Sequence, residues 1–287
     1  MTIEWFPGHM AAAREKAAET MAKIDVVIEV LDARLPGASS NPLIERLRNE
    51  RTRPCLKVLN KADLADPEAS AAWLRHFAKE KGVTAVAISS KRADQVAKIP
   101  RLAAALVPHR AGKGVRMMVM GAPNVGKSTL INALLKRKVA KTGDEPAVTR
   151  LQSRWTLDEE HDLIDTPGLM PAKMPNQGDA FMLAASHLIG PESYADEDVA
   201  TFLGDLLASR YPALLRTRYQ LDAKKQDAEK LDGYSVISAI ARKRGYLRKG
   251  GKPDLEKAGR ALMQDYRSGL LGRISLETPD TRFALAP

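Results

Sequence analysis

The first part of the chain alternates short apolar runs with polar segments of helical composition. The apolar runs occupy residues 25–31, 54–59, 83–88 and 115–120, and two shorter ones, 153–157 and 162–164, flank an acidic turn. Asp66-Pro67-Glu68 is typical of a helix N-terminus, we expect Gly82 to end that helix, and a later helix is expected to run to about Val107. Strand-length runs that alternate with helices predict an α/β domain whose mostly parallel sheet is flanked by helices.

The pattern changes after a linker at residues 171–178, which contains prolines and a glycine. Beyond it the chain favours helices, at about 179–189, 195–210, 212–220, 224–232, 235–244 and 253–266. Ser235 is a candidate N-cap, and apolar residues recur at one-face spacing in the last helix, at Leu255, Ala258, Leu262 and Tyr266. We therefore expect an α/β domain over residues 1–175 and an all-α domain over residues 176–287.

The apolar run 115–120 ends in a glycine-rich turn. The turn reads Gly121-Ala122-Pro123-Asn124-Val125-Gly126-Lys127-Ser128, the Walker A pattern, and a helix-like segment follows it. The backbone N–H groups of such a loop, together with the positive end of the helix, bind phosphate. We expect Lys127 to reach the β- and γ-phosphates and Ser128 to bind Mg²⁺. The residues expected to contact the nucleotide here are Asn124, Val125, Gly126, Lys127, Ser128 and Thr129.

A candidate base-recognition motif, Asn60-Lys61-Ala62-Asp63, follows the run 54–59. The Asp63 carboxylate can accept two hydrogen bonds from a guanine ring N–H and its exocyclic amino group, a pair of donors that adenine lacks. The stem of Lys61 can lie across the base, and Asn60 belongs to the same turn. Ser89, Ser90 and Lys91 follow the next apolar run and can back the ring through loop amides. The base predicted from these residues is guanine.

Further polar residues follow the phosphate loop in sequence. Thr149 lies in a polar loop, where we expect it to meet Mg²⁺ and the γ-phosphate and to act in catalysis with Lys127. Asp165-Thr166-Pro167-Gly168 follows a strand-like run. Asp165 is expected to hold Mg²⁺ through water, and the Gly168 N–H to donate to the γ-phosphate.

The charge of the chain adds a second partner class. The formal net charge is +10 and the sequence pI is about 9.6, which favours a polyanion, nucleic acid before membrane. Basic residues gather within residues 242–260, and those predicted to contact RNA are Arg242, Lys243, Arg244, Arg248, Lys249 and Lys252. A basic face that is simply solvated is the alternative. The single cysteine, Cys55, excludes a disulfide framework and a cysteine zinc site.

The nucleotide motifs resemble those of translation-factor-type GTPases, but their order differs. In an ordinary GTPase the phosphate loop comes first and N-K-x-D comes late, whereas here Asn60-Lys61-Ala62-Asp63 and Ser89-Ser90-Lys91 precede the phosphate loop. This order implies a circular permutation, with the joint at about residues 99–114. Such a permutation costs little because domain termini often lie close together.

The whole set of motifs resembles the ribosome biogenesis GTPase A family, also called YlqF. The residues that carry the resemblance are Trp5-Phe6-Pro7-Gly8-His9-Met10, Asp32-Ala33-Arg34, Asn60-Lys61-Ala62-Asp63, Gly121 to Ser128, Lys141-Thr142-Gly143-Asp144 and Asp165-Thr166-Pro167-Gly168. The resemblance implies a circularly permuted P-loop GTPase domain followed by a helical domain. It also implies GTP and GDP as ligands, Mg²⁺, and a role in late assembly of the large ribosomal subunit.

Leu169 stands where Ras-like enzymes have a glutamine that orients the attacking water. Leucine cannot polarise water, so another group must act. In the family a histidine is the proposed substitute, which maps onto His9, although a helix-entry role for His9 is the alternative. Asn124 matches the asparagine of potassium-activated GTPases and so implies a K⁺ site. Ala147 departs from the glycine usual in the family's switch region, and the change removes backbone freedom there.

The function expected from these residues is that of a cytoplasmic, monomeric GTP hydrolase activated by the ribosome. It would bind the large-subunit precursor, through rRNA and ribosomal proteins, in the GTP state and leave after hydrolysis. No apolar run reaches transmembrane length and no secretory signal is evident, so no membrane partner is expected. The alternatives are an RNA-processing GTPase and an RNA-binding scaffold that uses GTP as a structural ligand.

Overall fold

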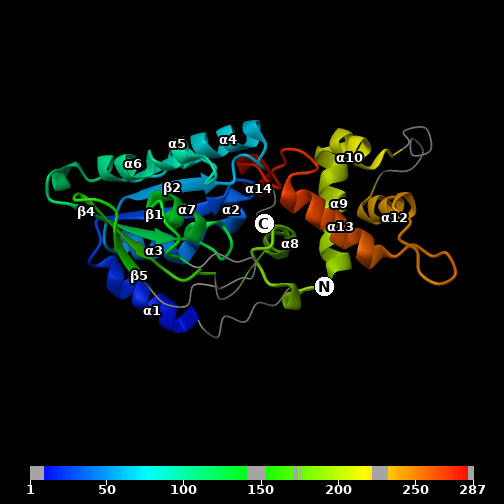
Figure 1. Cartoon of the computed structure of the whole chain (residues 1–287), viewed down its shortest axis with the longest axis horizontal. Helices are drawn as coiled ribbons and strands as arrows, with labels where there is room; N and C mark the ends of the chain where they lie inside the picture. The colour runs from blue at the N-terminus through cyan, green and yellow to red at the C-terminus, as the bar shows by residue number, and fades with distance from the viewer. Residues whose placement is uncertain (1–9, 141–152, 171–173, 175, 222–231, 284–287) are drawn as a thin grey trace. The chain divides into compact units, whose positions relative to one another are not determined.

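The computed structural model describes residues 10–140, 153–170, 174, 176–221 and 232–283, and these belong to two compact units. The first unit contains the described residues up to 170 together with those from 277 onward. The second unit contains the described residues from 174 to 276. Figure 1 shows the strands and helices of both units.

Six strands within the described ranges form one sheet in the first unit, in the order β3-β2-β1-β4-β6-β5. The strands are β1 (Val26–Asp32), β2 (Cys55–Asn60), β3 (Val83–Ala87), β4 (Val115–Met120), β5 (Ser153–Thr156) and β6 (His161–Asp165). The pairings among β1, β2, β3, β4 and β6 are parallel, whereas β5 pairs with β6 in the antiparallel direction. The expected mostly parallel α/β sheet is confirmed.

The strand order places a topological switch point between β1 and β4. From β1 the chain moves outward through β2 to β3, then returns to β4 and continues in the other direction to β6. Ligands of open α/β sheets bind at the carboxyl ends of the strands at such a point. The strand before Asn60-Lys61-Ala62-Asp63 is β2 and the strand before the phosphate loop is β4, so both motifs lie at this same edge.

The central strands of the sheet are buried because helices cover both of its faces. Every residue of β1 and β2 is buried. The helices of this unit are α1 (Met10–Met21), α2 (Pro36–Ser39), α3 (Pro42–Glu50), α4 (Pro67–Phe77), α5 (Ala93–Val96), α6 (Ile99–Ala105), η1 (Pro108–Arg110), α7 (Lys127–Leu134) and α14 (Pro279–Phe283). Met21 of α1 and Ile44 of α3 share a core cluster with Val27, and Trp73 and Phe77 of α4 share another with Leu59.

Two of the predicted helix boundaries in this unit are wrong. Asp66 is the expected N-cap and accepts hydrogen bonds from the N–H groups of Glu68 and Ala69, but α4 ends at Phe77 rather than near Gly82. The expected single helix up to about Val107 is two short helices, α5 and α6. A new helix begins at α6 because Pro100 is one of its first residues. Proline fits the first turn of a helix but interrupts a helix interior.

The chain returns to the sheet unit at Glu277, a residue that is only 2% exposed. Its carboxylate accepts a hydrogen bond from the Ala38 N–H at 2.8 Å and pairs with Arg282 at 3.0 Å. The Trp73 indole N–H donates to the Glu277 carbonyl at 3.3 Å. These contacts fix the segment after residue 276 against α2 and α4, next to the loop that follows β1.

The second unit is helical. Its helices are α8 (Gln177–Ala185), η2 (Pro191–Ser193), α9 (Asp196–Arg210), α10 (Pro212–Tyr219), α12 (Gly233–Lys243) and α13 (Leu255–Ser268). Ala258, Leu262 and Tyr266 of α13 are buried, as their spacing predicts. The N-cap of α12 is Asp232, which accepts from the Ser235 N–H, so the choice of Ser235 as the cap is wrong. The expected helix at 224–232 falls almost wholly outside the described residues.

The Asp265 carboxylate on α13 joins three helices of this unit. It accepts hydrogen bonds from Arg218 at 2.9 Å, from the Tyr219 hydroxyl at 2.9 Å and from Arg244 at 2.7 Å. Burial alone would raise the pKa of Asp265, but these donors and the two guanidinium charges outweigh it and hold the pKa below its usual range. The ionised carboxylate therefore stabilises the packing of α10 and α12 on α13.

Within the ranges that the structure describes, no helix has the length and apolar character needed to cross a membrane.

Candidate functional site

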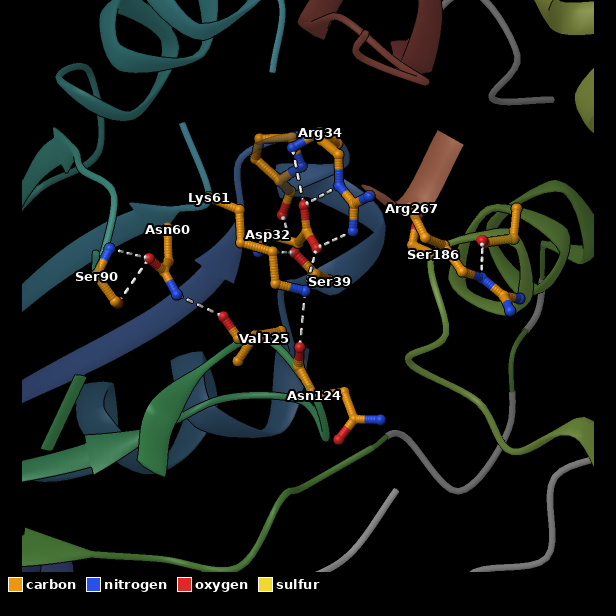
Figure 2. A network of polar contacts seen from close by, with 12 residues as sticks. Asp32, Arg34, Ser39, Asn60, Lys61, Ser90, Asn124, Val125, Ser186 and Arg267 are labelled. Carbon is orange, nitrogen blue, oxygen red and sulfur yellow. Dashed lines mark hydrogen bonds and ion pairs between the residues drawn. The ribbon is translucent and has the colours of Figure 1, made fainter. Parts of the chain in front are cut away.

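The side chain of Asn60 joins three segments at the carboxyl edge of the sheet. Its Nδ2 group donates to the carbonyl of Val125 in the phosphate loop at 2.8 Å. Its Oδ1 atom accepts from the backbone N–H and the hydroxyl of Ser90, at 3.0 and 2.8 Å (Figure 2). Asn60 is buried at the end of β2, so these hydrogen bonds are shielded from water. The Asn60–Asp63 turn, the serine loop and the phosphate loop are thus held together.

Lys61 makes a second connection to the phosphate loop. Its Nζ group donates to the carbonyl of Asn124 at 2.8 Å and to Asp32 Oδ2 at 2.9 Å (Figure 2). The residue adopts a φ of 62°, which turns the chain sharply after β2. Burial lowers the pKa of Lys61, and the charge of Asp32 opposes that shift. The ammonium therefore forms a bridge between the end of β1 and the phosphate loop.

Asp63 lies on the exposed side of the same turn. Its carboxylate is 3.5 Å from the Lys91 ammonium, and the two side chains are 36% and 77% exposed. Ser89 is buried; its N–H donates to Gln95 and its hydroxyl accepts from the Lys91 N–H. The turn and the serine loop therefore present Asp63 toward solvent, where an incoming base can reach it.

The phosphate loop needs glycine at two positions for steric reasons. Gly121 has a φ of 143° and Gly126 a φ of 101°, in the region that L side chains avoid. A Cβ atom at Gly121 would overlap the Val30 carbonyl, and one at Gly126 would overlap the amide of Asn60. Gly126 is also the N-cap of α7 and offers no side chain to its first N–H groups. Such an uncapped helix start favours an anionic ligand.

Lys127 is buried at the start of α7, with 6% of its surface exposed. Its Nζ group donates to the carbonyls of Gly121 and Ala122, at 3.1 and 2.7 Å. Burial lowers the pKa of Lys127 to about 8, and the charge of Asp165 offsets part of the shift. The ammonium is therefore held beneath the loop by two carbonyls that a phosphate can replace as partners.

Asp165 fits a magnesium site. It is 1% exposed, and neither oxygen of its carboxylate has a hydrogen-bond partner within the described residues. Burial raises its pKa to about 6, against the opposing charge of Lys127. Buried carboxylates without partners are costly, so open lone pairs here favour a cation or its bound water. Ser128 lies beside Lys127 in the first turn of α7, where Mg²⁺ would need it.

The segment after Asp165 lies directly against the phosphate loop. The Thr166 hydroxyl donates to the Val119 carbonyl at 2.9 Å, and a Cβ atom at Gly168 would come within 2.9 Å of the Pro123 backbone. Leu169 is 1% exposed, packs in the core with Met118, and donates its N–H to the Gly121 carbonyl. The Leu169 side chain faces the core, so it offers nothing to an attacking water.

Four of the residues singled out in the sequence have no contact in the site as the structure describes it. His9 and Thr149 lie outside the described residues, as does Ala147. Thr129 is exposed on α7, one residue beyond Ser128.

The sequence reasoning assigned no role to Asp32 and Arg34, which the structure places beside Lys61. Arg34 binds Asp32 through two parallel hydrogen bonds, from Nε to Oδ1 at 2.9 Å and from Nη2 to Oδ2 at 2.8 Å. Both residues are almost fully buried. The sequence feature that could have indicated this pair is a carboxylate at the end of a buried strand with an arginine two residues later, a spacing that allows the two side chains to meet.

The basic residues of the helical unit differ in their surroundings. Arg242, Lys243, Arg248, Lys249 and Lys252 are exposed, whereas Arg244 is half-buried on Asp265 and lies over the Tyr219 ring. Leu247 and Pro253 pair across a short hairpin, whose tip holds Gly250 and Gly251 at positive φ. The exposed cations therefore lie at the end of α12 and on this hairpin.

Comparisons with known proteins agree with the motifs. The sequence model of a family described as "50S ribosome-binding GTPase" matches residues 116–231. A Bacillus cereus protein, ribosome biogenesis GTPase A, is 38% identical over 98% of this chain and 95% of its own length. A Bos taurus protein, mitochondrial ribosome-associated GTPase 1, is 31% identical over 95% of this chain and 88% of its own length.

A solved structure of Thermotoga maritima YlqF with bound GDP has the same fold. It superimposes with a TM-score of 0.68 at 23% identity and covers 92% of this chain and 99% of its own.

Proposed function

Because this chain belongs to the ribosome biogenesis GTPase A family, we propose that it is a GTP hydrolase that acts in ribosome assembly. The observation that carries the proposal is the joining of the base motif to the phosphate loop, through the Asn60 bond to Val125 and the Lys61 bond to Asn124. These two bonds support a single guanine nucleotide that reaches from Asp63 to Lys127. The neighbouring Asp165, with its open oxygens, supports phosphate chemistry at the same edge.

In the proposed mechanism the chain binds, orients and neutralises the nucleotide. Lys127 exchanges its bonds to the Gly121 and Ala122 carbonyls for the β- and γ-phosphates. The N–H groups at the start of α7 donate to the phosphates, and Asp63 accepts from the base. Ser128, Asp165 and Thr149 would hold Mg²⁺, and the ion would supply positive charge that stabilises the leaving phosphate oxygens.

A residue other than Leu169 must orient the attacking water. We propose His9 for this role on the ground of the resemblance to the family, since the buried, apolar Leu169 side chain cannot fill it. We further propose a K⁺ ion near Asn124, which would neutralise charge between the phosphates. Asn124 already takes a φ of 56°, so its side chain leaves the loop at a turn rather than along a strand.

The proposed partner is a large-subunit precursor, bound in the GTP state and released after hydrolysis. Co-sedimentation of the full chain with large ribosomal subunits tests this, with a non-hydrolysable GTP analogue in one arm and GDP in the other. We expect most of the protein to sediment with subunits in the analogue arm and little in the GDP arm. Equal sedimentation in both arms would contradict the nucleotide-dependent release.

Hydrolysis rates separate the alternative functions. The buried Leu169 side chain cannot orient the attacking water, so GTP hydrolysis by the protein alone is expected to be slow. We expect the single-turnover rate to rise when large subunits are added. A rate that is unchanged by subunits would favour the scaffold in which GTP is a structural ligand. Acceleration by another RNA alone would favour an RNA-processing GTPase.

The exposed cations of α12 and its hairpin are the proposed RNA-binding residues. Replacing Arg242, Lys249 and Lys252 with glutamine should flatten the salt dependence of RNA binding, by ~0.7–0.9 in the log–log slope for each phosphate that is no longer neutralised. Arg260→Gln is a matched control, since that exposed arginine already pairs with Asp196 and Glu256. A triple variant whose slope equals that of the wild type would place the RNA-binding surface elsewhere.

A further inference from the structure

The Asp32 carboxylate holds two cations at once. It accepts both hydrogen bonds of the Arg34 fork and also the Lys61 ammonium at 2.9 Å (Figure 2). Asp32 is fully buried at the last position of β1. Burial alone would raise the pKa of Asp32, but the charges of Arg34 and Lys61 outweigh that effect and hold the pKa far below its usual range. The carboxylate is therefore ionised whenever the protein is folded at neutral pH.

The backbone of Asp32 is fixed independently of the two cations. Its backbone N–H donates to the Ser39 hydroxyl at 3.1 Å, and β1 pairs Asp32 with Asn60 in the sheet register. The next residue, Ala33, donates its N–H to the Asn60 carbonyl at 2.7 Å. The backbone that carries the carboxylate is thus anchored beside the first residue of the base motif, whereas Lys61 has a long, flexible side chain whose position depends on its partners.

Lys61 transmits this anchoring to the phosphate loop. The atom that binds Asp32 also donates to the Asn124 carbonyl at 2.8 Å. Without the Asp32 charge, the guanidinium of Arg34 would repel the Lys61 ammonium, since the two cations share one carboxylate. Lys61 would then leave Asn124, and both the lysine stem beside the base and the loop carbonyl would lose their fixed positions.

We propose that Asp32 is a positioning residue for nucleotide binding, with Arg34 orienting its carboxylate so that Lys61 stays bridged to the phosphate loop. Asp32 acts through Lys61 and does not touch the nucleotide itself. The inference rests on the proposed binding of a guanine nucleotide at this site. It predicts that the effect of Asp32 on the nucleotide exists only while Lys61 is present.

A double-mutant cycle on the full-length protein tests the proposal. The variants are Asp32→Asn, Lys61→Met and the two combined, and the readout is the dissociation rate of fluorescently labelled GDP. Asp32→Asn is expected to speed dissociation by about 10- to 100-fold, the range for hydrogen bonds between charged groups. In the Lys61→Met background the same change should add less than about 2-fold, because the bridge is already gone. Equal effects of Asp32→Asn in both backgrounds would overturn the proposal.

Glu29→Gln is the matched control on the same strand. Glu29 is also a buried carboxylate of β1 near a lysine of β2, with Lys57 at 3.8 Å, but it accepts its hydrogen bonds from the Ser40 hydroxyl and the Asn41 N–H. Its substitution is expected to change thermal stability while leaving GDP dissociation within about 2-fold of wild type. A comparable acceleration in Glu29→Gln would show that any loss of a buried carboxylate in β1 has this effect, and would overturn the specific role.

A charge-preserving variant covers the case in which Asp32→Asn does not fold. Arg34→Lys keeps the ion pair but loses the planar fork, so it should speed GDP dissociation by a smaller factor, again only when Lys61 is present. Unchanged dissociation in a folded Arg34→Lys protein would remove Arg34 from the role. Failure of the wild-type protein to bind labelled GDP would instead contradict the proposed function, which distinguishes the two claims.

Discussion

Asp63→Asn is expected to lower the affinity for GTP by about 100-fold or more and to raise the affinity for xanthosine triphosphate. In the proposed complex the carboxylate of Asp63 would accept from two guanine donors, and an asparagine would turn one of these acceptors into a donor. Xanthine carries a carbonyl where guanine carries its amino group, so it matches the new donor. Asp63 lies on the solvent side of its turn, 3.5 Å from Lys91, so its replacement disturbs no buried pair. Competition against labelled GDP measures both affinities.

Asp66→Asn is the control for this substitution. It makes the same chemical change three residues along the chain, at the N-cap of α4, where asparagine caps as well as aspartate. Its affinities for GTP and xanthosine triphosphate should match those of the wild type. An Asp63→Asn protein that keeps wild-type GTP affinity would refute the assignment of guanine.

Lys127→Met is expected to reduce the rate of GTP hydrolysis by about 10²- to 10³-fold and to weaken GTP binding. The ammonium lies beneath the phosphate loop, bonded to the Gly121 and Ala122 carbonyls, and we propose that it neutralises charge on the β- and γ-phosphates. Methionine keeps the length and the buried stem but lacks the charge. Because the substitution removes the charge that opposes the raised pKa of Asp165 and the donor of two loop carbonyls, we expect thermal stability to fall, and the rates are compared for protein that still melts cooperatively.

The control for this second substitution is Lys138→Met, which replaces an exposed lysine shortly after α7. It should hydrolyse GTP at the wild-type rate. Single-turnover rates at saturating GTP separate the chemical step from binding, and thermal melts report the stability of each variant. Wild-type turnover in a Lys127→Met protein would take Lys127 out of the mechanism.

The strands and the phosphate loop could be predicted because their signals are local. A buried strand reads as an apolar run, and the glycines at 121 and 126 are required by backbone angles and close approach at those positions. The positions of Asn60 and Lys61 at one edge with the phosphate loop followed from the parallel strands, since such strands end at the same edge. Pattern and geometry therefore agree on where the Asn60–Asp63 turn and the phosphate loop lie.

The contacts around Asp32 could not be predicted because they depend on the conformation of the chain after β1 and on the neighbouring strand. Ser39 reaches back over seven residues to the Asp32 N–H, and Lys61 comes from the neighbouring strand. Neither spacing follows a helix or strand period. Arg244 illustrates the same limit in the helical unit, since its charge predicted a surface contact but its partner, Asp265, lies on a different helix. Glu277 likewise packs against Ala38, far away in the sequence.

The most direct test of the account is the displacement of labelled GDP from the full-length protein by unlabelled nucleotides. The central claim is that the Asn60–Asp63 turn and the Gly121–Ser128 loop bind one guanine nucleotide together. We expect GTP and GDP to displace the label from a single site per chain, and ATP to compete at least about 10³-fold more weakly. Displacement by ATP at concentrations similar to those of GTP would contradict the claim, because it would show a phosphate site that the base motif does not serve.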